Sequence, residues 1–200
     1  MINSVLTNTE TTVASTPQEK QSRLVALLRS YRSVIVAYSG GVDSTYLSAI
    51  AHEALGDKAL IVTAQSPSLA EAEFVFATTL ARDRGWNFRV VKTRETADPR
   101  WQQNDASRCY FCKSELFRVL GDLVRAEGIV RVLYGAIPDD LADVRPGQRA
   151  AAEYEALAPL IDVGLTKKQI RLLSQERDLP SWDKPQAACL ASRFPTGTAI

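Results

Sequence analysis

The stretch Val34-Ile-Val-Ala-Tyr-Ser-Gly-Gly-Val-Asp-Ser-Thr-Tyr-Leu-Ser48 decides the fold of this chain. Its first residues form a β-branched run that predicts a strand, and the apolar residues from Tyr46 to Leu55 recur at helical spacing. Between the two runs, Gly40 and Gly41 provide a tight turn. A strand that passes through a glycine turn into a helix is the first unit of a parallel α/β sheet.

The same alternation of strands and helices continues outward from this unit. We expect further strands over residues 59–64, 86–91 and 130–135, with helices over 69–84 and up to about Glu127. A last helix is expected after Thr166, which forms a capping-box pattern with Gln169. The pattern predicts an α/β fold, a doubly wound parallel sheet with helices on both faces, which binds ligands beyond the carboxyl ends of its strands.

Composition excludes several classes of protein. With 200 residues, 46% hydrophobic and 24% charged, the chain suits one globular domain. A net charge of +1 creates no overall electrostatic attraction to nucleic acid or to an anionic membrane, so neither partner is expected. No apolar run approaches the roughly 20 residues of a bilayer span, and the polar N-terminus does not resemble a signal peptide. We expect a cytoplasmic protein with a flexible tail over residues 1–18 and one domain over residues 19–200.

The glycine turn has the composition of an anion site. Backbone N–H groups and the helix dipole meet where the strand enters the helix, and serine and threonine hydroxyls can add donors. The predicted pyrophosphate-binding residues are Ser39, Gly40, Gly41, Asp43, Ser44 and Thr45, with Asp43 capping the helix or helping to hold Mg²⁺. The lysine motif of ordinary P-loop enzymes is missing, which favours attack at the α-phosphate of ATP and release of pyrophosphate. An ordinary capped helix after a glycine turn is the alternative interpretation.

Three cysteines suggest redox, metal or catalytic chemistry rather than structural disulfides. Cys109 and Cys112 precede or begin a helix beside cations, which we expect to lower their thiol pKa values. Cys189 is remote in sequence from this pair. The ordinary role of a free cysteine is that of a small buried apolar residue. The lone histidine, His52, falls inside the first predicted helix, so a Cys₃His zinc site is not expected. A dithiol couple, a 4Fe-4S cluster with one open iron, and a persulfidated or sacrificial Cys189 all stay open.

Four motifs together resemble one family. They are Ser39-Gly-Gly-Val-Asp-Ser44, Arg108-Cys-Tyr-Phe-Cys-Lys113, Tyr134-Gly-Ala-Ile-Pro-Asp-Asp-Leu-Ala-Asp-Val-Arg-Pro-Gly147 and Ala188-Cys-Leu-Ala-Ser-Arg-Phe-Pro195. The first is the signature of PP-loop ATP pyrophosphatases, and the combination is similar to the LarE family. The resemblance implies an ATP-dependent sulfurtransferase of nickel-pincer nucleotide cofactor biosynthesis. Such enzymes adenylate pyridinium-3,5-biscarboxylic acid mononucleotide, release pyrophosphate and form a thiocarboxylate.

Residue roles follow from the same resemblance. It implies that the glycine-turn residues bind ATP, pyrophosphate and Mg²⁺, and that Ser66 lies near AMP. Cys109, Cys112 and Cys189 would hold a 4Fe-4S cluster that carries sulfur, whereas other family members give up a cysteine's own sulfur. The implied substrate residues are Asp140, Asp143, Arg145, Glu153, Ser192 and Arg193. The resemblance also implies a homo-oligomer, and the family's small C-terminal domain is not expected within residues 19–200.

Other functions stay open at this point. A PP-loop tRNA thiolase would share the adenylation step but would need a basic groove and salt-sensitive RNA binding. An amide-forming ATP pyrophosphatase would use the same glycine turn and keep the cysteines as structural residues. A non-enzymatic nucleotide sensor would bind AMP or ATP without releasing pyrophosphate.

Overall fold

The computed structural model describes residues 15–142 and 146–200, and its centre is a parallel sheet. The strands are β1 (Val34–Ala37), β2 (Ala59–Gln65), β3 (Phe88–Lys92) and β4 (Arg131–Tyr134), in the order β3-β2-β1-β4. Val34 pairs with Ala59 on one side and with Arg131 on the other, and both pairings are parallel. Because the strand order reverses at β1, the crevice beyond the carboxyl ends of β1 and β4 is the switch point where such sheets bind ligands.

The central strand is buried on both faces. Val34 and Val36 belong to one core cluster, whereas Ile35 belongs to the other, and all three side chains are fully buried. Leu60 and Ile61 of β2 divide between the clusters in the same way. A strand covered on both sides needs apolar residues at every position, which explains the uninterrupted β-branched run.

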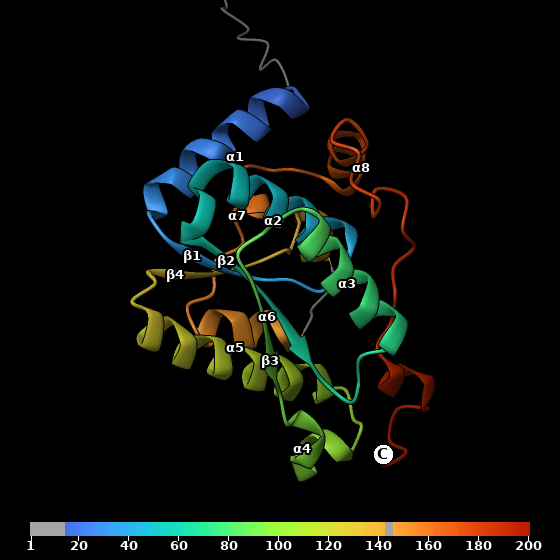
Figure 1. Cartoon of the computed structure of the whole chain (residues 1–200). Helices are drawn as coiled ribbons and strands as arrows, with labels where there is room; N and C mark the ends of the chain where they lie inside the picture. The colour runs from blue at the N-terminus through green and yellow to red at the C-terminus, as the bar shows by residue number, and fades with distance from the viewer. Residues whose placement is uncertain (1–14, 143–145) are drawn as a thin grey trace, which may run out of the picture.

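Helices cover both faces of the sheet (Figure 1). On one face lie α1 (Pro17–Tyr31), α2 (Val42–Leu55), α3 (Glu71–Asp83) and α8 (Lys167–Gln175), and on the other α5 (Arg108–Glu127) and α6 (Pro146–Glu153). Shorter helices are α4 (Pro99–Gln102), α7 (Pro159–Asp162), η1 (Gly56–Lys58), η2 (Glu95–Ala97), η3 (Pro138–Ala142) and η4 (Leu190–Arg193). The doubly wound arrangement expected from the sequence is therefore present.

Helix α1 was not expected from the sequence. Thr16 caps it, accepting a hydrogen bond from the Glu19 N–H at 3.2 Å, while the Glu19 carboxylate accepts one from the Thr16 N–H at 2.8 Å. Leu24 and Leu28 of this helix are fully buried against α2 and its neighbours. Residues 17 and 18 of the predicted tail thus belong to the helix, and residues 1–14 lie outside the described residues. The capping-box pattern was the signal for this helix.

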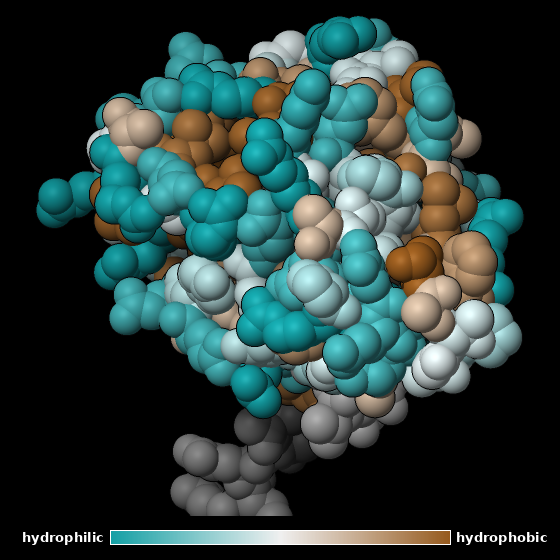
Figure 2. Space-filling view, turned by 90° about the horizontal axis from the view of Figure 1, so that it is seen from below, coloured by the Kyte–Doolittle hydropathy of each residue, from teal (hydrophilic) through white to brown (hydrophobic). Residues whose placement is uncertain are grey.

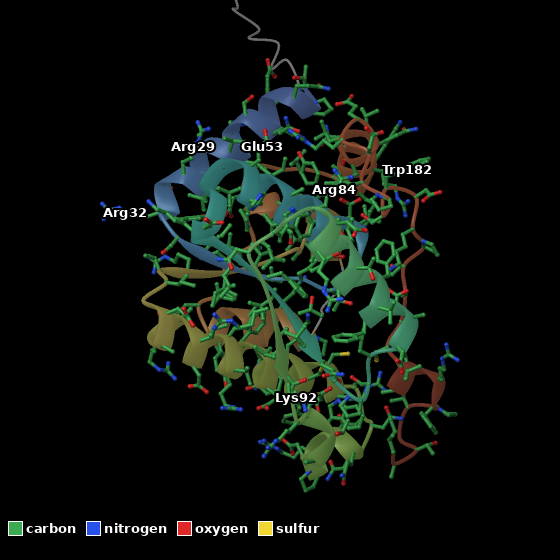
Figure 3. The ribbon with its side chains drawn as sticks, viewed as in Figure 1. Arg29, Arg32, Glu53, Arg84, Lys92 and Trp182 are labelled. Carbon is green, nitrogen blue, oxygen red and sulfur yellow. The ribbon has the colours of Figure 1, made fainter. Side chains whose placement is uncertain are left out.

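The strap, residues 176–200, connects the two helical layers. It runs from α8 past α3 toward α4 on the other side of the sheet (Figure 1). Arg84, at the end of α3, donates hydrogen bonds to the carbonyls of Arg177 and Asp178, which fastens the start of the strap (Figure 3). Further along, Arg171 of α8 donates to the carbonyl of Trp182 at 2.8 Å. Hydrogen bonds from arginine side chains to its backbone carbonyls therefore help to fix the course of the strap, although little of it is helix or strand.

The surface carries no continuous apolar face on the side viewed in Figure 2, where brown patches are separated by hydrophilic residues. Within residues 15–142 and 146–200, no helix combines the length and the apolar character needed to cross a bilayer.

Candidate active site

The phosphate loop, residues 39–45, joins β1 to α2 at the switch point of the sheet. Gly40 has a φ of +76°, and a Cβ at this position would lie 3.0 Å from the Cβ of Ala77. Glycine therefore suits the turn both in conformation and in space. The Ser44 hydroxyl donates to the Gly41 carbonyl at 3.2 Å and lies 3.0 Å from the Ser39 hydroxyl. These bonds close the loop around the N-terminus of α2, whose first N–H groups have no intrahelical partner and can bind an anion.

Gly135 lets the end of β4 touch this loop. A Cβ on Gly135 would lie 2.8 Å from the backbone N of Ser44 and 3.0 Å from its Cα. Thr45, which was predicted to bind pyrophosphate, is fully buried at the start of α2. The close backbone approach at Gly135 makes the phosphate loop and the end of β4 one rigid wall of the site.

Asp43 faces cationic and acidic groups from two other segments. It forms an ion pair with Lys167, whose own N–H donates to Asp139 Oδ2 at 3.1 Å. Burial raises the pKa of Asp43, while the hydrogen bond from Lys167 opposes the rise and nearby Asp140 adds to it. Asp43 Oδ1 is buried and has no hydrogen-bond partner among the described residues. Carboxylate oxygens are the donors that Mg²⁺ prefers, so Asp43 and Asp140 could hold this ion.

Lys184 reaches the phosphate loop from the strap. Its Nζ lies 2.7 Å from Glu73 Oε2, 3.4 Å from the Gly40 carbonyl oxygen and 3.8 Å from the centroid of the Phe76 ring. Arg171 holds the backbone at this point by donating to the Lys184 carbonyl at 2.9 Å. The arrangement places a partly buried ammonium group beside the turn where the phosphates are expected.

Ser66 follows β2 and belongs to a hydrogen-bonded group at the same edge of the sheet. The hydroxyls of Ser66 and Ser68 both donate to Glu95 Oε1, the second at 3.0 Å. Leu190 N–H donates to the Ser68 carbonyl at 2.9 Å. The loop after β2, where AMP was predicted to bind, is therefore bonded to the turn that contains Cys189.

The fold brings the three cysteines into one region. Cys109 and Cys112 lie at the start of α5, and Cys189 directly precedes η4. Arg108 draws η4 toward α5 by donating a hydrogen bond to the Ala191 carbonyl at 2.8 Å. Cys109 and Cys189 are exposed, and charge on either of them would act on Cys112. The predicted grouping of the cysteines agrees with this placement.

The expected lowering of the thiol pKa values is wrong for Cys112. Burial is the main cause that raises the pKa of this thiol to about 11. Lys113 lowers it, but Glu95, Cys109 and Cys189 raise it further. Loss of hydration disfavours the thiolate more than the adjacent cation favours it. Cys112 is therefore held as a neutral thiol at physiological pH.

A metal cluster does not fit the cysteines as they are placed here. No group of three or more histidine, cysteine, aspartate or glutamate side chains within the part of the chain that the structure describes is arranged to hold a metal ion. The expectation that Cys109, Cys112 and Cys189 hold a 4Fe-4S cluster is therefore not supported by this arrangement.

The predicted substrate residues on and before α6 are only partly described. The Glu153 carboxylate accepts a hydrogen bond from the Tyr110 hydroxyl at 2.5 Å and one from Arg149 Nε at 3.0 Å. Tyr110 first, and then Arg149, lower the pKa of Glu153. The Glu153 side chain is thus bound to a surface pair on α5 and α6. Asp143 and Arg145 lie outside the described residues.

Ser192 and Arg193 lie in η4 beside the cysteines. The Ser192 hydroxyl donates to the Cys189 carbonyl at 2.5 Å and lies 3.6 Å from Cys189 Sγ. Both Ser192 and Arg193 are exposed, which suits contact with a substrate phosphate.

Sequence reasoning missed four residues that complete this site. Lys167 and Lys184 supply cations to the phosphate loop, Gly135 permits the close approach of β4, and Glu95 binds the loop after β2. Lys167 follows the Thr166 helix cap, which was the available signal for its position. The other three depend on contacts between distant segments.

Two proteins illustrate the sequence similarity of this chain to known proteins, although no protein-family model matches it. It is 45% identical over 166 residues to an uncharacterized protein of Synechocystis sp., covering 83% of this chain and 62% of that protein. It is 34% identical over 182 residues to pyridinium-3,5-bisthiocarboxylic acid mononucleotide synthase of Lactiplantibacillus plantarum, covering 90% of this chain and 66% of the synthase. The chain therefore spans less than two thirds of the length of these relatives.

A solved structure shows the same fold. The NH3-dependent NAD synthetase of Campylobacter jejuni, in complex with the nitrate ion, superposes with a TM-score of 0.69 at 17% identity. The match covers 88% of this chain and 80% of the synthetase. The chain has the PP-loop, adenine nucleotide alpha hydrolase-like fold, which confirms the fold class expected from its sequence.

Proposed function

We propose that this chain carries the ATP-dependent part of a sulfurtransferase that acts on a carboxylate of a pyridinium mononucleotide. The reaction is adenylation of the carboxylate with release of pyrophosphate, followed by replacement of AMP to give a thiocarboxylate. Similarity to the Lactiplantibacillus plantarum synthase supports this substrate class and a place in nickel-pincer nucleotide cofactor biosynthesis. Assembly as a homo-oligomer, which the LarE resemblance implies, stays a prediction.

The observation that carries the proposal is the pair of hydrogen bonds that hold the cysteine turn. Leu190 N–H donates to the Ser68 carbonyl at 2.9 Å, and Arg108 donates to the Ala191 carbonyl at 2.8 Å. Cys189 therefore lies between the loop after β2 and the helix that carries Cys109 and Cys112. A thiol next to a nucleotide edge is what transfer of sulfur to an acyl adenylate requires.

The adenylation step follows from the phosphate loop. Amide N–H groups of residues 39–45 and the ammonium groups of Lys167 and Lys184 would bind the β- and γ-phosphates of ATP. A substrate carboxylate oxygen then attacks the α-phosphorus, and the bond to the bridging oxygen breaks, so that pyrophosphate leaves. Charge on this leaving group is stabilised at the switch point by the fixed donors.

The sulfur step can be written with Cys189 as donor. Its thiolate attacks the acyl carbon, AMP leaves with the bonding electrons, and a thioester forms. Removal of the Cα proton of Cys189 then breaks the Cβ–S bond, which leaves the thiocarboxylate on the substrate and dehydroalanine at position 189. The described cysteines do not form a metal-binding arrangement, and we infer that the sulfur comes from Cys189 itself.

A single-turnover experiment tests both steps. The protein is mixed anaerobically with ATP, Mg²⁺ and pyridinium-3,5-biscarboxylic acid mononucleotide, and pyrophosphate, AMP, thiocarboxylate and polypeptide mass are measured. We expect substrate-dependent pyrophosphate release, a thiocarboxylate, and loss of the elements of H₂S from Cys189. Cys189→Ala should keep pyrophosphate release and lose the thiocarboxylate, while Lys168→Ala, an exposed position on α8, serves as control.

Each alternative predicts a different result in the same assay. Pyrophosphate release that requires ammonia and yields an amide would indicate an amide-forming enzyme, and release that requires tRNA would indicate a tRNA thiolase. Thiocarboxylate formation at the wild-type rate by Cys189→Ala would exclude Cys189 as the donor. If nucleotide binds tightly without any pyrophosphate release, the proposed enzyme function is wrong.

A further inference from the structure

A buried carboxylate outside the phosphate loop joins two parts of the site. Glu95 follows β3 in η2 and is only 3% exposed. Its Oε1 accepts hydrogen bonds from the hydroxyls of Ser66 and Ser68. Its Oε2 is also buried and has no hydrogen-bond partner within residues 15–142 and 146–200.

Burial of this group is unfavourable for stability alone. Removal of a carboxylate from water with one oxygen unpaired lowers the stability of a fold unless a partner compensates the charge. The two donors are neutral hydroxyls, which compensate less than a cation would. An apolar side chain would fill this space without burying a charge, whereas the carboxylate accepts hydrogen bonds from two serines of the loop after β2.

The hydrogen bonds lead from Glu95 to the cysteine turn in two steps. Glu95 holds the Ser68 side chain at 3.0 Å, and the Ser68 carbonyl accepts the N–H of Leu190 at 2.9 Å. Leu190 is the residue after Cys189. In the other direction, the Ser66 hydroxyl accepts the Ser68 N–H at 3.0 Å, so the whole loop after β2 is bound to the same carboxylate.

We propose that Glu95 is a positioning residue that holds the nucleotide-side loop at Ser66 and the Cys189 turn in one fixed relation, through the bonds of Ser66 and Ser68. Its role in sulfur transfer rests on the proposed function, whereas its control of the Leu190 hydrogen bond does not. Because the phosphate loop makes none of these bonds, loss of Glu95 should slow adenylation less than it slows sulfur transfer. Attack of the cysteine sulfur on the adenylate depends on it, since a misplacement near 1 Å can cost about a hundredfold in rate.

Glu95 also faces the cysteine helix. Its charge is one of those that act on Cys112, together with Lys113, Cys109 and Cys189. The carboxylate is therefore bonded to the loop after β2 and lies near enough to the start of α5 for its charge to act on Cys112.

The test compares Glu95→Gln, Glu95→Ala and wild type, with Glu115→Ala as a matched control. Glu115 accepts a hydrogen bond from the neighbouring Arg94 N–H at 3.3 Å, but its other bonds go to Arg118 on α5. Hydrogen exchange of the peptide that contains Leu190 is measured by mass spectrometry without any ligand. Single-turnover pyrophosphate release and thiocarboxylate formation are then measured separately. The glutamine side chain keeps an acceptor oxygen for both serines and removes only the charge.

We expect Glu95→Ala to lose protection at Leu190 and to form thiocarboxylate at least about tenfold more slowly, with a smaller decrease in the rate of pyrophosphate release. Glu95→Gln should restore protection and most of the sulfur transfer, and Glu115→Ala should resemble wild type. If Glu95→Ala does not fold, Glu95→Met keeps the side-chain length without an acceptor and carries the same expectations. Unchanged Leu190 protection in the alanine or methionine variant overturns the proposal. Absence of thiocarboxylate in the wild type contradicts the proposed function instead and leaves the exchange result decisive.

Discussion

Replacement of Gly135 by alanine should separate the phosphate loop from β4. The added Cβ would lie 2.8 Å from the backbone N of Ser44, and ordinary contacts begin at 3.4 Å, so the two segments must move apart by 0.6 Å (3.4 minus 2.8). The contacting atoms are backbone atoms in the first turn of α2, which cannot rotate away as a flexible side chain could. Overpacking of this kind costs about 1–3 kcal/mol.

The expected consequence for stability can be measured by thermal unfolding. For a chain of this size, about 1 kcal/mol corresponds to roughly 2–4 °C, so Gly135→Ala should lower the Tm by roughly 2–12 °C. The matched control is Gly121→Ala in the middle of α5, where a new Cβ would lie 3.8 Å from Arg125 Nη1. Because glycine weakens a helix interior, that variant should gain about 0.5–1 kcal/mol.

Nucleotide binding provides the second measurement for the same pair. The displaced loop in Gly135→Ala should bind ATP and Mg²⁺ more weakly by about tenfold, since about 1.4 kcal/mol of lost complementarity gives that factor. Gly121→Ala should bind ATP as the wild type does. If Gly135→Ala keeps both the wild-type Tm and the wild-type ATP affinity, the close contact between β4 and the phosphate loop does not exist as described.

Two further predictions concern charge at the site. Lys184→Met should reduce the rate of pyrophosphate release by about tenfold or more, because a charge-assisted bond to the phosphates is lost. The control Lys168→Met, on the exposed side of α8, should keep the wild-type rate. Equal rates for the two variants would exclude Lys184 from phosphate binding. Burial, followed by the charges of Glu95, Cys109 and Cys189, raises the pKa of Cys112 to about 11 against the opposing effect of Lys113. The rate at which iodoacetamide alkylates Cys112 should therefore increase steeply only as the pH approaches 11. Because Lys113 lowers the pKa of this thiol, Lys113→Gln should move the increase in alkylation rate to higher pH. The pKa of Cys112 is higher in the folded than in the unfolded chain, so the stability that the neutral thiol contributes is present below the unfolded pKa and is lost as the pH rises through about 11. Rapid alkylation of Cys112 near pH 7 would contradict the raised pKa.

The sequence alone determined the fold class and the position of the glycine loop between the first strand of the sheet and its helix. The run from Val34 to Tyr38 and the glycine pair after it are local patterns. A β-branched run followed by two glycines and a helical repeat is compatible with few structures other than a strand, a tight turn and a helix. The phosphate loop, the parallel sheet and the helix capped by Thr166 were therefore predictable. Helix α1 was also marked by its capping box, although it was not assigned.

Only the tertiary structure decided which side chains complete the site. Lys167 meets Asp43 across 124 positions of sequence, and Lys184 meets Gly40 across 144. Such contacts depend on how helices and the strap pack on the sheet, and no local periodicity encodes that packing. The pKa of Cys112 has the same origin: the adjacent Lys113 suggested a thiolate, but burial beneath neighbouring segments favours the neutral thiol. Local sequence specifies backbone conformation through short-range sterics and hydrogen bonds, whereas burial and charge at a site are sums over segments that only the folded chain brings together.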